Sequence, residues 1–178
     1  MSKINEDVIY FAKLNSDAKI PSKKDEDAGY DLYACFEEDF FVIEPHQTRP
    51  IPTGIAGAFS SKFYAQVEER SSLGKLGIKK NAGVIDSGYR GEYLILTYNT
   101  NDRPFIISKI DANQIATELI IGEKKYKKEE VIFYPFNKAI CQLILHEIPK
   151  LKTKEISYEE LLNFSSERGT GGFGSSGK

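Results

Sequence analysis

The sequence predicts an all-β protein, a barrel or a sandwich built from many short strands. Short segments rich in β-branched and aromatic residues recur along the chain, and clusters of turn-forming residues separate them. Helical periodicity is scarce by comparison. With 178 residues and 40% hydrophobic side chains, the chain is long enough to fill one core of ordinary size. We therefore expect a single β domain.

Nine segments carry the strand signal. In chain order they are residues 8–14, 31–36, 40–45, 63–69, 93–99, 104–110, 117–122, 131–136 and 139–148. Turn-forming stretches occupy residues 21–29, 44–50, 85–91 and 99–104. The charged run at 123–130 lies between two expected strands, so we expect it to be a solvated hairpin tip.

Two short segments have helical character. In SSLGKLGI, residues 71–78, Ser71 or Ser72 is expected to cap one or two helical turns. In SYEELLNF, residues 157–164, Ser157 and Glu160 have the spacing of a capping box. The second segment is short enough to be a connecting turn instead. The fold is therefore expected to contain one short helix.

Composition narrows the function. A net charge of −2 gives no overall electrostatic footprint for a long nucleic acid, although a local basic pocket remains open. No apolar run has the length of a membrane span, and the first ten residues lack the apolar core of a signal peptide, so we expect a cytoplasmic protein with no membrane partner.

Cysteine and histidine are too few for most metal chemistry. Cys35 and Cys141 lie far apart without a surrounding motif and are expected to be reduced and buried. His46 and His146 are the two histidines, and the H-x-E and P-C-x-x-C strings of the zinc nucleobase deaminases are absent. Any catalysis is expected to use carboxylate, hydroxyl or arginine groups.

Three strings place polar groups where chemistry is plausible. Asp86 opens a glycine-bearing turn between two apolar strands, although such an aspartate often serves only its own turn. Arg70 directly precedes Ser71 and Ser72 at an expected helix start, a pattern that suits an anion site or a plain cap. Asp31 is the one charge in a strand-like run and would pair with an arginine such as Arg70 or face water.

The C-terminus is rich in glycine. Residues 172–178 read G-x-x-x-x-G-K, but no Ser or Thr follows the lysine and no helix follows the loop, so a P-loop is excluded. A flexible tail is the simple interpretation. Arg168 and Phe173 favour a tail that closes over a flat, anionic ligand.

Taken together and in this order, five strings resemble the five motifs of the trimeric deoxyuridine triphosphatases (dUTPases). They are DAGYDLYA at 27–34, RSSLGKLGI at 70–78, NAGVIDSGYRGEY at 81–93, AICQLIL at 139–145 and RGTGGFGSSG at 168–177. The resemblance implies a distorted, jelly-roll-like β-barrel that forms a homotrimer. It also implies hydrolysis of dUTP to dUMP and pyrophosphate, which limits uracil in DNA and supplies dUMP for thymidylate synthesis.

The resemblance assigns roles residue by residue. Asp86 would be the base for the water that attacks the α-phosphorus, and Tyr89 would lie against the deoxyribose and exclude a 2′-hydroxyl. Asn81, with backbone groups near Gly83 and Val84, would read the uracil. Phosphates would be held by Arg70, Ser71, Ser72 and Gln142. Asp31 would support Arg70 or the hydrated metal ion without contacting the substrate itself. Mg²⁺ would be held by phosphate oxygens and water, with no protein cage.

The tail has roles of its own in the resemblance. It would be a lid supplied by a neighbouring subunit, with Phe173 stacked on the uracil beside Gly174. Arg168, Ser175 and Ser176 would contact the terminal phosphates. We expect residues 169–178 to be poorly ordered without a nucleotide. The domain is expected to cover 1–164 and the lid 165–178.

The chain departs from the family pattern in two places. Ser176 stands where threonine is common, and the link 100–137 is longer than usual, which predicts an added hairpin near residues 111–128. A related dCTP deaminase is one alternative, but that chemistry needs a glutamate at the position of Leu96. The other alternative is a nucleotide-switched regulatory protein that binds a partner protein through the insert.

Overall fold

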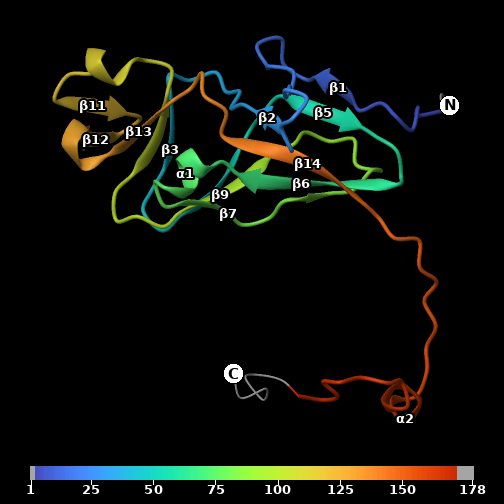
Figure 1. The fold of residues 1–178 in the computed structure, drawn as a ribbon. Helices are drawn as coiled ribbons and strands as arrows, with labels where there is room; N and C mark the ends of the chain where they lie inside the picture. The colour runs from blue at the N-terminus through green and yellow to red at the C-terminus, as the bar shows by residue number, and fades with distance from the viewer. Residues whose placement is uncertain (1–2, 172–178) are drawn as a thin grey trace. The chain divides into compact units, whose positions relative to one another are not determined.

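A computed structural model of the chain describes residues 3–171. It divides into two units, Met1–Ile148 and Pro149–Lys178. The first unit contains the β-structure (Figure 1). This boundary at Ile148 precedes the one at residue 164 that the sequence predicts.

The first unit contains all of the described strands. They are β1 Tyr10–Lys13, β2 Tyr30–Leu32, β3 Phe40–Ile43, β4 Thr48–Ile51, β5 Ile55–Ala58, β6 Phe63–Glu69, β7 Ile78–Lys80, β8 Val84–Ile85, β9 Ile95–Asn99, β10 Phe105–Ser108, β11 Glu118–Ile121, β12 Lys124–Lys127, β13 Ile132–Pro135 and β14 Cys141–Glu147. They form sheets in the orders β1-β5, β13-β10-β3, β11-β12, β2-β14-β6-β8 and β4-β9-β7. Of the strand pairs, β10–β13 is parallel and the others are antiparallel.

One core joins four of the five sheets. Its largest fully buried side chains include Leu32, Ile43, Ile55, Ile107 and Leu143, contributed by five strands. Because these strands all turn one apolar face inward, the sheets close around a single interior, as the all-β prediction requires. Cys35 and Cys141 are free and buried. Burial raises the pKa of both thiols above their ordinary value.

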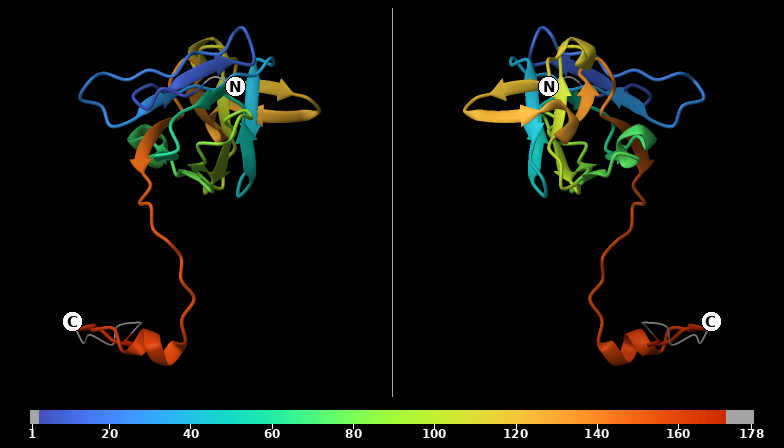
Figure 2. Two further views of the ribbon diagram at one scale, coloured as in Figure 1. Left: turned by 90° about the vertical axis from the view of Figure 1, so that its right-hand side faces the viewer. Right: turned by 90° about the vertical axis from the view of Figure 1, so that its left-hand side faces the viewer.

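Strand β10 is buried on both faces. Phe105 and Ile107 belong to the main core, whereas Ile106 points the other way into a second cluster. That cluster also contains Leu119 of β11 and Tyr126 of β12. Hairpin β11–β12 therefore covers the outer face of the β13-β10-β3 sheet, and Figure 2 shows the hairpin projecting from the first unit.

The charged run at 123–130 is not a hairpin tip, contrary to the prediction. Lys124–Lys127 is strand β12, and the turn is at Gly122, whose φ is +61°. Tyr126 is buried while its neighbours on β12 are exposed. The strand forms because one inward-facing aromatic side chain anchors it, and the lysines occupy water-facing positions.

Residues 3–171 form two short α-helices where the fold prediction has one. α1 spans Ser71–Gly74, and its N-cap is Arg70, which makes no side-chain capping bond, so the expected Ser71 or Ser72 cap is wrong. Two 3₁₀ turns, η1 Ala112–Gln114 and η2 Lys128–Glu130, flank hairpin β11–β12.

The second unit carries helix α2, Tyr158–Leu162. The Ser157 hydroxyl accepts the Glu160 N–H at 3.1 Å, and the Glu160 carboxylate accepts the Ser157 N–H at 3.1 Å. This is the capping box that the sequence predicts. Among residues 3–171, no helix has the length and apolar character needed to cross a membrane.

Candidate active site

Asp86 lies directly after the short strand β8, at the entry of a tight hairpin. Strand β8 pairs with β6 through Val84 and Gln66. The Tyr89 N–H donates to the Asp86 carbonyl at 3.0 Å, which closes the turn. The Asp86 carboxylate is exposed and has no hydrogen-bond partner among the described residues. It is therefore accessible to a ligand or a water molecule in front of the turn.

A pocket of about 260 Å³ opens beside Asp86. The pocket is lined by Val67, Ala82, Gly83, Val84, Ile85, Asp86, Tyr89, Glu92, Tyr93, Leu94 and Leu96. Its wall is mostly apolar, with two carboxylates and two phenols among the lining groups. Such a pocket suits a flat, mainly apolar ring with a few polar edges.

Two tyrosines form one wall of the pocket. The rings of Tyr89 and Tyr93 lie 6.4 Å apart and 20° from parallel. Tyr93 is 1% exposed, and its hydroxyl has no partner among the described atoms. Burial raises the pKa of Tyr93 to about 12, so this phenol stays neutral at physiological pH.

Gly83 brings backbone close to the pocket. Its carbonyl accepts the Val67 N–H at 2.8 Å, and a Cβ at this position would lie 2.7 Å from the Val67 carbonyl oxygen. Only glycine allows that approach. Asn81 donates from its side chain to Thr48 Oγ1 at 2.7 Å and from its backbone to the Leu96 carbonyl at 2.9 Å.

A second polar group gathers around Arg70, at the end of β6. Arg70 Nε lies 3.5 Å from Asp31 Oδ1 on β2. Gln142 of β14 is the cross-strand partner of Asp31 and donates to the Glu69 carbonyl at 3.4 Å. The pairing that the sequence allows for Asp31 and Arg70 is therefore present.

The serines after Arg70 occupy the first two positions of α1, where backbone N–H groups have no partner inside the helix. Both serines are exposed, and Ser72 Oγ lies 3.4 Å from the Tyr134 hydroxyl. Hydroxyls, free N–H groups and a guanidinium thus meet at one corner, which is the donor set that binds oxyanions.

The two groups do not share a pocket within one chain. Asp86, Gly83, Val84 and Tyr89 line the pocket, whereas Arg70, Ser71, Ser72 and Gln142 do not. Glu69 at one end of β6 pairs with Cys141, and Gln66, which pairs with Val84, is three residues away, or about 10 Å along the strand. The predicted site residues therefore form two separate clusters, one just after the end of β6 and one around β8, which pairs with β6.

Of the tail residues, Arg168 is described. Its Nε donates to the Gly171 carbonyl at 2.7 Å, and its side chain is exposed. Phe173, Gly174, Ser175 and Ser176 lie outside the described residues, as does most of the 169–178 segment for which disorder is expected. Their predicted roles stay predictions.

Sequence reasoning missed Glu92 and Tyr93 as parts of this site. Both lie within the string that contains Asp86, yet neither has a residue type or spacing that marks it. Their roles depend on partners far away in sequence, because Glu92 Oε1 accepts backbone N–H groups of Thr53 and Gly54. A single sequence gives no signal for that contact.

The described residues contain no group of three or more His, Cys, Asp or Glu side chains that could hold a metal ion. Asp31 is paired with Arg70, and Glu92, the second carboxylate of the Asp86 pocket, accepts the backbone N–H groups of Thr53 and Gly54. This donor set fits a divalent cation that keeps most of its water and phosphate ligands.

A protein-family model described as dUTPase matches residues 16–128, which is more than half of the chain. The chain belongs to the dUTPase family. The matched part includes Asp31, Arg70, Asn81, Asp86 and Tyr89.

Curated relatives agree with this dUTPase assignment. The chain is 35% identical over 162 residues to the deoxyuridine 5'-triphosphate nucleotidohydrolase of Candida albicans, covering 90% of this chain and 82% of that protein. It is 34% identical over 169 residues to the enzyme of the same name from Clostridioides difficile, covering 93% of this chain and 94% of that protein.

The fold agrees as well. The dUTPase of Staphylococcus bacteriophage 80alpha, solved with dUPNHPP, matches with a TM-score of 0.73 and 23% identity, covering 97% of this chain and 99% of that chain. At this identity the likeness concerns the fold. It corroborates the mostly β architecture of the dUTPase described above.

Proposed function

We propose that this dUTPase hydrolyses dUTP to dUMP and pyrophosphate, with Asp86 as the general base. The observation that carries the proposal is an exposed, unpaired carboxylate at the mouth of an apolar pocket, in a chain whose curated relatives are deoxyuridine 5'-triphosphate nucleotidohydrolases. The substrate class follows from the family, and the position of the base follows from the pocket.

In the proposed reaction, Asp86 accepts a proton from a water molecule as the water oxygen bonds to the α-phosphorus. The bond from that phosphorus to the bridging oxygen then breaks, and pyrophosphate leaves. A positioned base contributes roughly 10²–10⁴-fold to such a step. The rest of the catalysis is positioning and charge neutralisation, which Arg70 and the N–H groups of Ser71 and Ser72 would supply.

The pocket would hold the uracil and the deoxyribose. The apolar wall of Val84 and Leu96 suits the ring faces, and the backbone near Gly83 would supply polar groups for the uracil edge. Asn81 lies outside the pocket lining, and its amide would join them by giving up its bond to Thr48 Oγ1. Tyr89 would pack against the sugar and leave no room for a 2′-hydroxyl.

The substrate would bind as a complex of dUTP with Mg²⁺. Bound Mg²⁺ neutralises charge on the phosphate oxygens. Asp31 lies 3.5 Å from Arg70 and would orient its guanidinium toward the phosphates. Gln142 would add a neutral donor from β14.

A homotrimer would account for the separation of the two clusters within one chain. The pocket of Asp86 and the anion-binding corner of Arg70 lie apart within one chain, so a site that needs both is incomplete in a monomer. We propose that neighbouring subunits bring the two clusters together. The tail would close the site, with Phe173 on the uracil and Arg168, Ser175 and Ser176 on the phosphates.

The test is a measurement of pyrophosphate release from dUTP, dTTP, UTP and dCTP. We expect selective turnover of dUTP and a loss of roughly 10²–10⁴-fold in kcat for Asp86→Asn. Asp39→Asn is a matched control, because Asp39 is an exposed aspartate outside the pocket. Equal turnover by Asp86→Asn and wild type would eliminate the proposed base.

An assay of ammonia release from dCTP tests the alternative activity, deamination. Leu96 lines the pocket at the position where that chemistry needs a glutamate, so a proton shuttle is missing there. Ammonia release from dCTP at a rate comparable to dUTP hydrolysis would reverse the assignment.

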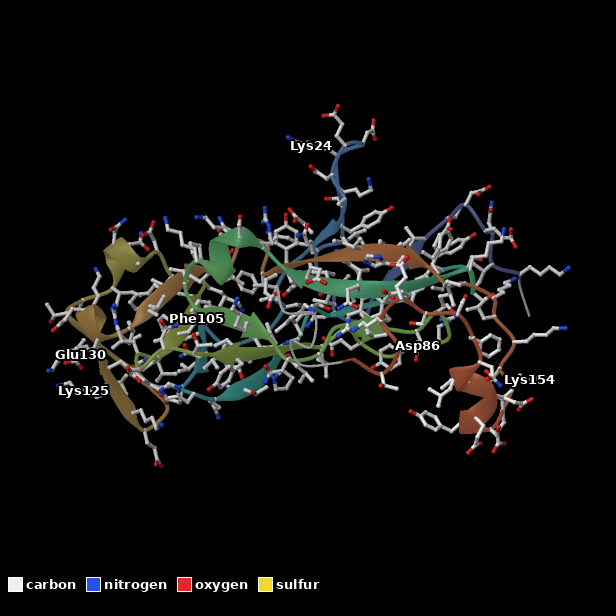
Figure 3. The ribbon with its side chains drawn as sticks, turned by 60° about the horizontal axis from the view of Figure 1, so that its bottom comes forward. Lys24, Asp86, Phe105, Lys125, Glu130 and Lys154 are labelled. Atoms are coloured by element: carbon white, nitrogen blue, oxygen red, sulfur yellow. The ribbon has the colours of Figure 1, made fainter. Side chains whose placement is uncertain are left out.

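A protein-binding role for residues 111–128 is a second candidate. Hairpin β11–β12 exposes Ile120, which is 73% exposed, opposite Lys125. Asp86 and Lys125 lie toward opposite ends of the first unit (Figure 3), so a protein bound to the hairpin would leave the pocket accessible. Ile120→Asp should abolish binding of such a partner while dUTP turnover is unchanged.

A further inference from the structure

The turn between β4 and β5 is buried, tightly packed and hydrogen-bonded to the active-site hairpin. Thr53 is 1% exposed, and Gly54 has a φ of +63°. A Cβ at Gly54 would lie 2.9 Å from the Cβ of Ala18 and 3.1 Å from Cys35 Sγ, so the turn is tightly enclosed. Its carbonyl at Gly54 accepts the Leu14 N–H at 2.7 Å. The turn is fixed by the core on the side away from the pocket.

The Glu92 carboxylate joins the hairpin to this turn. Its Oε1 accepts the Thr53 N–H at 3.1 Å and the Gly54 N–H at 2.7 Å. Both bonds are charge-assisted and end on the same oxygen atom. Thr53 Oγ1 donates to the Tyr93 carbonyl at 2.8 Å, and the Tyr93 N–H donates to the Ile55 carbonyl at 2.8 Å. The chain at Glu92 and Tyr93 is therefore held at four points.

The same residue holds Tyr89. The Tyr89 hydroxyl donates to the Glu92 carbonyl at 3.1 Å, across the Arg90–Gly91 turn. A Cβ at Gly91 would collide with the Tyr89 ring, so the ring packs directly on this backbone. The orientation of Tyr89 thus depends on the position of the Glu92 backbone, which the Glu92 carboxylate fixes.

We propose that Glu92 is a positioning residue that sets the selectivity of the enzyme for deoxyribose over ribose. It acts through Tyr89: the carboxylate anchors the Glu92 backbone to the buried 53–54 turn, and the Glu92 carbonyl holds the Tyr89 phenol against the sugar position. The inference rests on the proposed function, because it takes Tyr89 as the residue that excludes the 2′-hydroxyl. It adds a residue of the pocket wall whose carboxylate bonds the backbone of the 53–54 turn.

The test is the ratio of kcat/KM for dUTP to kcat/KM for UTP in three variants. Glu92→Ala removes both anchoring bonds, and the ratio should fall roughly ten- to hundredfold as the Tyr89 ring loosens. Glu92→Gln keeps an oxygen that can accept both N–H groups and should retain most of the ratio. Tyr89→Phe removes the bond to the Glu92 carbonyl and should lower the ratio in the same direction as Glu92→Ala.

The ratio separates positioning from simple loss of structure. A variant that merely folds less well loses active enzyme, which lowers turnover of both substrates equally and leaves the ratio unchanged. Glu118→Ala, which removes an exposed carboxylate of hairpin β11–β12, gives the baseline. If folded Glu92→Ala, judged by circular dichroism, keeps the wild-type ratio, the inference is wrong.

The assay distinguishes a failure of the inference from a failure of the proposed function. Wild-type enzyme that does not turn over dUTP would overturn the proposed function. Wild-type enzyme that prefers dUTP, together with an unchanged ratio in Glu92→Ala or an equal fall in Glu92→Gln, would overturn the role of Glu92 alone.

Discussion

The backbone of Gly57 lies against the hydroxyl of Tyr93, so closely that a Cβ at Gly57 would collide with that oxygen. The same Cβ would lie 3.0 Å from the Tyr10 carbonyl of the paired strand β1. Strand β5 therefore has no room for a side chain at Gly57. The contact links the core strand β5 to the tyrosine pair of the active-site pocket.

Gly57→Ala should destabilise the enzyme by about 1–3 kcal/mol, because the core must shift to accept the methyl group. Adding Tyr93→Phe removes the oxygen atom that the methyl group meets, so the double variant should regain part of the lost stability. Urea denaturation of the wild type, both single variants and the double variant measures the coupling. Strictly additive free energies would show that the Tyr93 hydroxyl is not the obstacle.

Tyr93→Phe alone should be neutral or stabilising by up to about 1 kcal/mol, because the buried hydroxyl has no partner among the described atoms. Tyr134→Phe is the matched comparison. The Tyr134 hydroxyl is buried and donates to the Ala139 carbonyl at 2.7 Å, so its removal should cost about 1 kcal/mol. Thermal unfolding of the two variants checks the sign of each change. A Tyr93→Phe variant as destabilised as Tyr134→Phe would contradict the assignment.

The attachment of hairpin β11–β12 should depend on pH through Glu44. Its carboxylate accepts hydrogen bonds from Lys124 Nζ and the Tyr126 hydroxyl, both at 2.7 Å. Burial alone would raise the pKa of Glu44, but these two bonds and the charges of Lys124 and Arg49 together outweigh it, and the pKa lies below its usual value of 4.5. Because the folded-state pKa is lowered, the stabilisation is complete above about pH 4.5 and is lost as the pH falls through the folded-state value.

Glu44→Gln should therefore lose stability at neutral pH and show a weaker dependence on pH below about pH 4.5 than the wild type. Hydrogen exchange of the β11 and β12 amides, measured at several pH values, reports on the hairpin itself. Glu118→Gln is the control, since that carboxylate pairs with Lys125 at 2.6 Å within the hairpin and leaves its attachment untouched. The same acid-induced loosening in Glu44→Gln and wild type would exclude Glu44 as its cause.

The parts of the site that the sequence predicts are those where one local string determines the geometry. Asp86 and Tyr89 are three residues apart in one turn, so their relation is fixed by the hairpin alone. Asp31 lies on β2 and Arg70 follows β6, so the two are far apart in sequence, but opposite charge identifies them as a possible pair. Glu92 is different, because its partners are backbone groups 38 and 39 residues away.

The missed strands have physical reasons too. Strand β4 contains Pro50, which lacks an N–H, and it is tolerated because β4 is an edge strand of its sheet. After Ile55, strand β5 contains only small residues with little strand preference, and it forms because it pairs with β1 and packs on Tyr93. In β12, one buried tyrosine outweighs three lysines. In each case tertiary contacts override local preference.

The Arg70–Asp31 pair should matter for binding and little for stability. Both side chains are partly exposed and the two atoms lie 3.5 Å apart, so the pair contributes at most about 1 kcal/mol to folding. Asp31→Asn leaves Arg70 charged but less well oriented. We expect KM for dUTP to rise several-fold with a nearly unchanged melting temperature. A large drop in melting temperature with unchanged KM would assign Asp31 to the fold instead.

Because the two clusters lie apart within one chain, the last prediction tests whether neighbouring subunits build one shared site. If subunits share sites, an Asp86→Asn chain and a chain truncated after Asn163 are each inactive, because one lacks the base and the other lacks the tail. Mixed after unfolding and refolding together, they should regain part of the wild-type activity, since some sites then combine an intact Asp86 with an intact tail. The truncated chain should still fold, because the core lies within residues 1–148. Light scattering of the mixture gives the subunit number. Folded, co-assembled chains with no regained activity would mean that each subunit closes its own site.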